Sequence, residues 1–96
     1  MTTSVFTDDT ITLQAIFKDI NGALIDPDNF EASLLVYRDD TGDSVDTQQM
    51  TRSSAGTYTI DWLVPSEETA YIVEMRGYFS SSPQLKRLRI RARFRP

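Results

Sequence analysis

Five arginines near the C-terminal end alternate with other residues and form the most distinctive chemical pattern in the chain. They occupy every second position from residue 87: Arg87, Arg89, Arg91, Arg93 and Arg95. Guanidinium groups stay charged at all physiological pH values and donate paired hydrogen bonds to carboxylates and phosphates. In an extended segment, alternate residues lie about 6.5 Å apart on one side. The pattern therefore predicts a positively charged surface, called here the arginine stripe.

The arginine stripe has three interpretations. It is a solvated face whose charge is offset by acids on neighbouring strands, a docking surface for an acidic protein, or a track for a nucleic-acid backbone. Nucleic acid is the least favoured partner, because the rest of the chain is acidic and no exposed aromatic residues alternate with the arginines. On the preceding strand, Glu74 is the one acid expected to face outwards.

Charge is distributed unevenly along the chain. All 14 acids lie in residues 1–74, where only Lys18, Arg38 and Arg52 offset them, whereas residues 75–96 hold seven cations and no acid. This separation predicts an electrostatic partner, which could be an acidic protein, a nucleic acid or another copy of the chain. Head-to-tail contacts between copies would pair opposite charges, so we expect a homo-oligomer within an assembly.

The chain contains neither cysteine nor histidine. These residues supply most zinc ligands, thiol nucleophiles and proton shuttles near neutral pH, so their absence makes most enzyme classes improbable. We expect no enzymatic activity, no cofactor and no metal. The acidic turns at Asp26-Pro27-Asp28 and at residues 39–43 could offer oxygen ligands to calcium, but neither matches an EF-hand and turn chemistry accounts for both.

The segments that would position the arginine stripe show the period of β-strands. Apolar residues recur at every second position in several segments, and no segment shows a helical period. These segments are residues 10–18, 30–38, 57–62, 70–76 and 85–94. Residues 44–52 predict a weaker edge strand, anchored by Val45 and Met50. The turns between them predict one all-β domain over residues 1–96, an antiparallel sandwich of about seven strands.

The alternation also predicts which side chains lie inside the sandwich. In the last segment the inward set is Leu88, Ile90, Ala92 and Phe94. Phe30 is expected to face the core at the start of its strand, and the aromatic residues Tyr58, Trp62 and Tyr71 are interpreted as core residues. Tyr78 and Phe79 fall in a loop predicted over Gly77–Pro83, where we expect them to form a second contact surface.

Four pieces of the sequence, in their order and spacing, resemble immunoglobulin-like domains of bacterial surface proteins and of tailed-phage virion proteins. They are residues 11–17 (ITLQAIF), 21–27 (NGALIDP), 56–58 (GTY) and 70–73 (AYIV). The resemblance extends from about Phe6 to Phe94, although the cysteine pair of antibody domains is missing. It implies an immunoglobulin-like sandwich and a role in binding or assembly rather than in catalysis.

The N-terminus has no basic region followed by an apolar run, and no later stretch approaches the ~18 apolar residues that would span a bilayer. We therefore expect no membrane partner and synthesis in the host cytoplasm. Bacterial adhesin modules normally sit in long exported chains, so a free-standing copy of this kind resembles a component packaged into a virion.

These observations predict a non-enzymatic virion structural protein: a capsid decoration protein, a neck protein or a tail accessory. Its partners are expected to be other virion proteins, bound through the arginine stripe and through Tyr78 and Phe79. Two alternatives remain open. The first is an adhesion module that binds carbohydrate or a host surface through its loops, and the second is a nucleic-acid-binding module that uses the arginine stripe.

Overall fold

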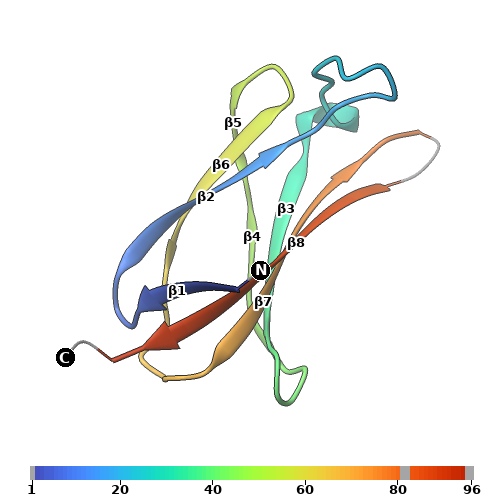
Figure 1. Ribbon diagram of the computed structural model, residues 1–96. Helices are drawn as coiled ribbons and strands as arrows, with labels where there is room; N and C mark the ends of the chain where they lie inside the picture. The colour runs from blue at the N-terminus through green and yellow to red at the C-terminus, as the bar shows by residue number, and fades with distance from the viewer. Residues whose placement is uncertain (1, 81–82, 95–96) are drawn as a thin grey trace.

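The computed structural model describes residues 2–80 and 83–94, which form two β-sheets packed face to face (Figure 1). The strands are β1 (Thr2–Phe6), β2 (Thr10–Ile16), β3 (Ala32–Arg38), β4 (Ser44–Gln49), β5 (Thr51–Ser54), β6 (Thr57–Leu63), β7 (Ala70–Tyr78) and β8 (Pro83–Arg93). The predicted all-β fold is confirmed, with eight described strands where about seven were expected. Among the described residues, no helix is long and apolar enough to cross a membrane.

The larger sheet has the strand order β1-β8-β7-β3-β4, and the smaller sheet has the order β2-β6-β5. Neighbouring strands are antiparallel except β1 and β8, which run parallel. The strand β8 thus lies inside the larger sheet, between β7 and β1. One side of β8 faces the core, and the other side forms part of the outer surface of that sheet.

The single edge strand predicted over residues 44–52 is in fact two strands in different sheets. The strand β4 pairs with β3 in the larger sheet, and β5 pairs with β6 in the smaller one. Met50 lies at the crossing between them, where it is buried, whereas Val45 is 39% exposed. Five positions separate these two residues, so a regular strand would point them to opposite sides. Only one of them could anchor a core.

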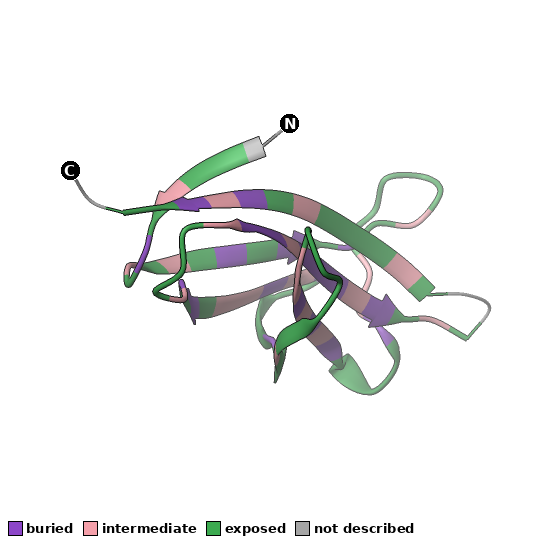
Figure 2. Cartoon of the chain, turned by 90° about the horizontal axis from the view of Figure 1, so that it is seen from below, coloured by how far each residue is buried: buried purple, intermediate pink, exposed green. Residues whose placement is uncertain are grey.

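The core lies between the sheets, and buried and exposed residues alternate along the strands that enclose it (Figure 2). Tyr58 and Trp62 on β6 and Tyr71 on β7 are buried, as the alternation predicted. The rings of Trp62 and Tyr71 meet edge to face across the two sheets, with centroids 6.0 Å apart. Aromatic pairs of this geometry stabilise a core beyond the area that they bury.

Besides Val45, two apolar residues expected in the core are exposed. Phe30 is 61% exposed because the bend at Pro27 continues into a 3-10 turn over Asp28–Phe30, so that β3 begins only at Ala32. Its ring packs under the guanidinium of Arg52, 5.4 Å from the centroid. Phe94 is 58% exposed because β8 ends at Arg93, one residue before it.

The Asp26 carboxylate joins the connection between β2 and β3 to the turn between β5 and β6. It accepts hydrogen bonds from the Gly56 amide at 2.9 Å, from the Tyr58 hydroxyl at 3.1 Å and from Arg52 Nε at 3.0 Å. The Gly56 carbonyl in turn accepts the Phe17 amide at 2.8 Å. Sequence reasoning explained Asp26 as turn chemistry, whereas the structure shows it bridging segments about thirty positions apart.

The tight contact at Gly56 generates a stability prediction. Gly56 has a φ of +69°, and a Cβ there would lie 2.9 Å from the Phe17 carbonyl oxygen; Gly42 has a φ of +76° with no atom within 4 Å of such a Cβ. Replacing Gly42 with alanine should reduce the free energy of unfolding by about 1–2 kcal/mol through backbone strain alone. Gly56→Ala should cost about 1–3 kcal/mol more through overpacking. Urea unfolding of both variants measures the difference, and equal losses would contradict the close contact.

The contacts of Asp26 generate a pH prediction. Hydrogen bonds from Arg52 first and then from the Gly56 amide lower the pKa of Asp26 from its ordinary 3.8 to about 2. Because this pKa is depressed in the folded state, the ionised carboxylate stabilises the fold above about pH 4, and the effect is lost as the pH falls toward 2. Thermal unfolding from pH 6 to pH 2 should therefore show Asp26→Asn less stable than the native protein at pH 6, with the difference shrinking below pH 4. A difference independent of pH would contradict this assignment.

Candidate functional site

The strand β8 presents its arginines on the outer surface of the larger sheet. Ile90 and Ala92 are completely buried on its inner side, so Arg89, Arg91 and Arg93 point away from the core. Arg87 continues this outward row toward the β7–β8 hairpin. Arg95, the fifth predicted member of the arginine stripe, lies outside the described residues. The alternation thus places the described arginines as the sequence predicted.

Arg87 pairs with the acid that sequence analysis identified on the neighbouring strand. Its Nε donates to Glu74 Oε1 at 2.8 Å, and this contact raises the pKa of Arg87. The Tyr37 hydroxyl lies 3.4 Å from the same carboxylate oxygen, and Arg76 Nη2 lies 3.8 Å from Oε2. Glu74 is only 7% exposed, although it lies on the outer side of the sheet. Arg87 therefore has a carboxylate partner within the protein, which it shares with Arg76.

Arg89 pairs with an acid that the sequence analysis did not assign to this surface. Its Nε donates to Asp39 Oδ2 at 2.9 Å, and Asp39 follows directly after the end of β3. In the sheet, β7 lies between β3 and β8, so this contact reaches across β7 from the residue that follows β3. The ion pair between Arg89 and Asp39 could not be predicted from the sequence, because it depends on the order of the strands in the sheet. The solvated-face interpretation therefore applies to Arg87 and Arg89.

Arg91 and Arg93 differ from the first two arginines. Within residues 2–80 and 83–94, the side chains of these two residues contact no carboxylate. Arg91 lies between Ala70 on β7 and Ser4 on β1, and Arg93 lies beside Phe6. A shallow hollow at this end of the sheet is lined by Ser4, Val5, Phe6 and Arg93. Arg91 and Arg93 thus form a short cationic patch without an ion pair among the described residues, and the Glu68 carboxylate at this end of the strand accepts the Phe94 amide at 2.8 Å.

The remainder of this outer surface is partly apolar. Leu35, Tyr37 and Ile72 are half-buried there, and Leu85 is 42% exposed near the hairpin. In the sheet register, Tyr37 lies opposite Ile72, and Ile72 lies opposite Arg89. A surface that mixes arginine, tyrosine and aliphatic residues has the composition of protein-binding faces, in which arginine and tyrosine carry much of the binding energy.

Tyr78 and Phe79, the predicted second contact surface, have different surroundings. Tyr78 is 50% exposed, and its hydroxyl accepts a hydrogen bond from Arg76 Nη1 at 3.2 Å. Phe79 is half-buried and packs edge to face against Phe17, with ring centroids 5.9 Å apart. The predicted loop begins later than expected because β7 continues through Gly77 to Tyr78. Of these two residues, Tyr78 is the one available for contact.

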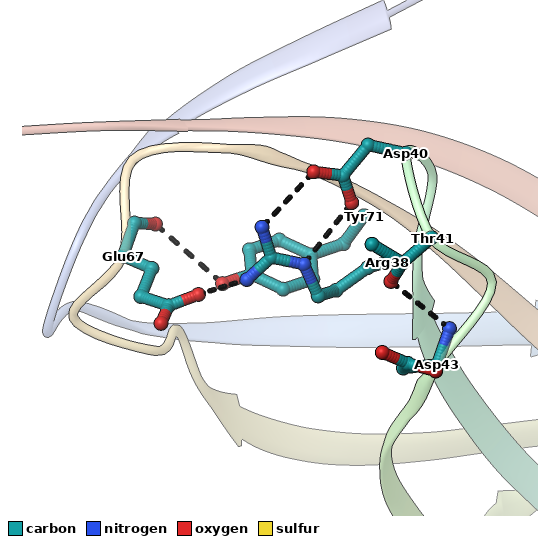
Figure 3. A network of polar contacts seen from close by, with 6 residues as sticks. All are labelled: Arg38, Asp40, Thr41, Asp43, Glu67 and Tyr71. Carbon is teal, nitrogen blue, oxygen red and sulfur yellow. Dashed lines mark hydrogen bonds and ion pairs between the residues drawn. The ribbon is translucent and has the colours of Figure 1, made fainter.

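A second polar network occupies the end of the sandwich where β3 turns into β4 (Figure 3). Arg38 Nε donates to Asp40 Oδ1 at 3.0 Å, and the same guanidinium forms an ion pair with Glu67 from the loop between β6 and β7. These contacts raise the pKa of Arg38 and lower that of Asp40. Among the described residues, no three carboxylates gather as metal ligands. Through Asp40 and Glu67, Arg38 ties the turn after β3 to the loop between β6 and β7.

Comparison of the chain with models of known protein families, with curated proteins and with solved structures gives no match in any of the three.

Proposed function

We propose that this protein is a non-enzymatic assembly module that docks an acidic protein surface through the outer face of its larger sheet. The observation that carries the proposal is the cationic patch of Arg91 and Arg93, which lies beside Phe6 and has no carboxylate partner among the described residues. A partner that supplies carboxylates there would pair both guanidinium groups and cover the adjacent apolar side chains.

The short extent of this patch favours a protein over a nucleic acid. Arg87 pairs with Glu74, which Arg76 also approaches, and Arg89 pairs with Asp39, so carboxylates interrupt the continuous positive track expected from the sequence. A nucleic-acid backbone carries a charge about every 3.4 Å along each strand and favours extended tracks of cations. The hollow beside Arg93 is lined by Val5 and Phe6 as well as by Ser4, and a protein surface can fill its apolar part, whereas a phosphate backbone would use only the polar groups.

The parent assembly in this proposal is the virion of a tailed phage, assembled in the host cytoplasm. The support is the resemblance to immunoglobulin-like virion domains. The strand order is compatible with it, because β8, β7 and β3 share one sheet while β2, β6 and β5 share the other. Immunoglobulin-type sandwiches divide their strands in this way. Capsid decoration, neck and tail positions all suit a small module with one docking face.

The docking face can be tested with a charge-matched pair of variants. Arg91→Ser/Arg93→Ser removes the patch, and Lys18→Ser/Lys86→Ser removes the same charge from exposed positions outside it. We expect the first variant to bind immobilised polyglutamate about tenfold more weakly than the native protein and the second to bind nearly normally. Equal affinity of the two variants would contradict the proposal. Tighter binding to a DNA duplex than to polyglutamate would favour the nucleic-acid alternative.

The location can be tested separately by immunogold electron microscopy of phage particles from cells that express the protein. Gold at a fixed position on the capsid, neck or tail supports the virion proposal. Particles without label would overturn the location and leave the docking-face result intact.

A further inference from the structure

The strand β2 is an unusually unprotected edge. Its sequence, TITLQAI, contains no charged residue, no proline and no glycine, and its register with β6 is regular over all seven residues. It is the first strand of the smaller sheet, so one side is paired with β6. In the described part of the chain, no backbone hydrogen bond reaches its other side between Thr10 and Ile16. Long, regular, uncharged edges are templates for pairing with another strand.

The hydrogen bonds at its two ends determine which backbone groups of β2 are open. Phe17 donates its amide to Gly56, and Asp9 accepts the amide of Val64. Odd-numbered residues therefore bond to β6, since antiparallel strands alternate in this respect. The amides and carbonyls of the even-numbered residues point to the open side. These residues are Thr10, Thr12, Gln14 and Ile16.

The other three edges of the sandwich are protected against strand addition. The strand β4 contains Asp46, and its pairing with β3 is interrupted by a register shift. The strand β5 contains Arg52 and has a similar shift in its pairing with β6. The strand β1 has only five residues and lies beside the arginines of β8. Charges, irregularities and short length are common devices that prevent edge pairing.

We propose that β2 pairs antiparallel with β2 of a second copy, across a two-fold axis at Leu13. In this register Thr12 faces Gln14 of the second copy, and Thr10 faces Ile16. All four residues with open backbone groups then form hydrogen-bonded pairs, which gives about eight backbone hydrogen bonds. The two smaller sheets become one continuous sheet across the axis.

The side chains of β2 are complementary in this register. On the inner side, Leu13 meets Leu13 of the second copy, and half-buried Ile11 meets Ala15, which extends the apolar layer across the axis. On the outer side, the Thr12 hydroxyl donates to Asp61 Oδ1 at 2.7 Å, and it can accept a hydrogen bond from Gln14 of the second copy. The absence of charge on β2 means that the two copies do not repel each other there. This contact lies on the smaller sheet, so it is independent of the arginine stripe.

The register can be tested with two double variants that differ only at residue 14. Thr12→Lys/Gln14→Lys places lysine opposite lysine across the axis, whereas Thr12→Lys/Gln14→Glu places lysine opposite glutamate. Sedimentation velocity over a range of concentrations should show a dimer for the native protein and for the lysine–glutamate variant, and a monomer for the double-lysine variant. A monomeric native protein at every concentration would overturn the proposal, as would equal association of the two variants.

A measurement on the native sequence covers the case in which a variant fails to fold. Amide hydrogen exchange should be slow at Leu13 and Ala15 at all concentrations. At Thr12 and Gln14 it should slow at least tenfold as the protein concentration rises through the dimerisation range. Fast exchange at Thr12 and Gln14 throughout would rule out pairing at this edge. The Arg91→Ser/Arg93→Ser variant should dimerise normally, so failure of the proposed docking face and failure of this contact give different results.

Discussion

Ile90 and Ala92 are fully buried on β8, and their burial determines where the alternate side chains of that strand lie. Burying an isoleucine side chain stabilises a fold by about 1.5–3 kcal/mol. Enclosing an unpaired guanidinium in the same place would cost far more than that. A shift of one residue along β8 would turn the arginines toward the core and expose Ile90 and Ala92. The register of β8 is therefore strongly fixed. The outward position of the arginines is thus a consequence of the core.

The arginines on the outer surface differ in whether a carboxylate lies within reach. Glu74 and Asp39 reach Arg87 and Arg89 because β7 and the turn after β3 lie on one side of β8. On the other side lies β1, whose residues Thr2–Phe6 include no acid. Among the described residues, Arg91 and Arg93 therefore form no ion pair, and they lie beside an edge strand that ends in Val5 and Phe6. This asymmetry links the strand order to the proposed docking face.

Period-two alternation predicted much of this structure, including β2, β6, β7 and the outward arginines. The alternation gave wrong predictions where a turn interrupts the strand and where the chain passes from one sheet to the other. Phe30 has the spacing of a core residue, but the turn that follows Pro27 holds it outside. Residues 44–54 cross from one sheet to the other, which no local pattern indicates. The contacts of Asp39 with Arg89 and of Asp26 with Gly56 join segments far apart in the sequence and depend on how the strands are arranged.

The register of β8 can be measured directly, because the native chain contains no cysteine. Single cysteines would be introduced in turn at positions 89 to 93, and their reaction with a thiol reagent would be followed in the folded protein. Fast labelling at positions 89, 91 and 93 and slow labelling at positions 90 and 92 is the predicted result. Labelling that is fast at 90 and 92 and slow at 91, or that does not alternate, would contradict the placement of the arginines on the outer face.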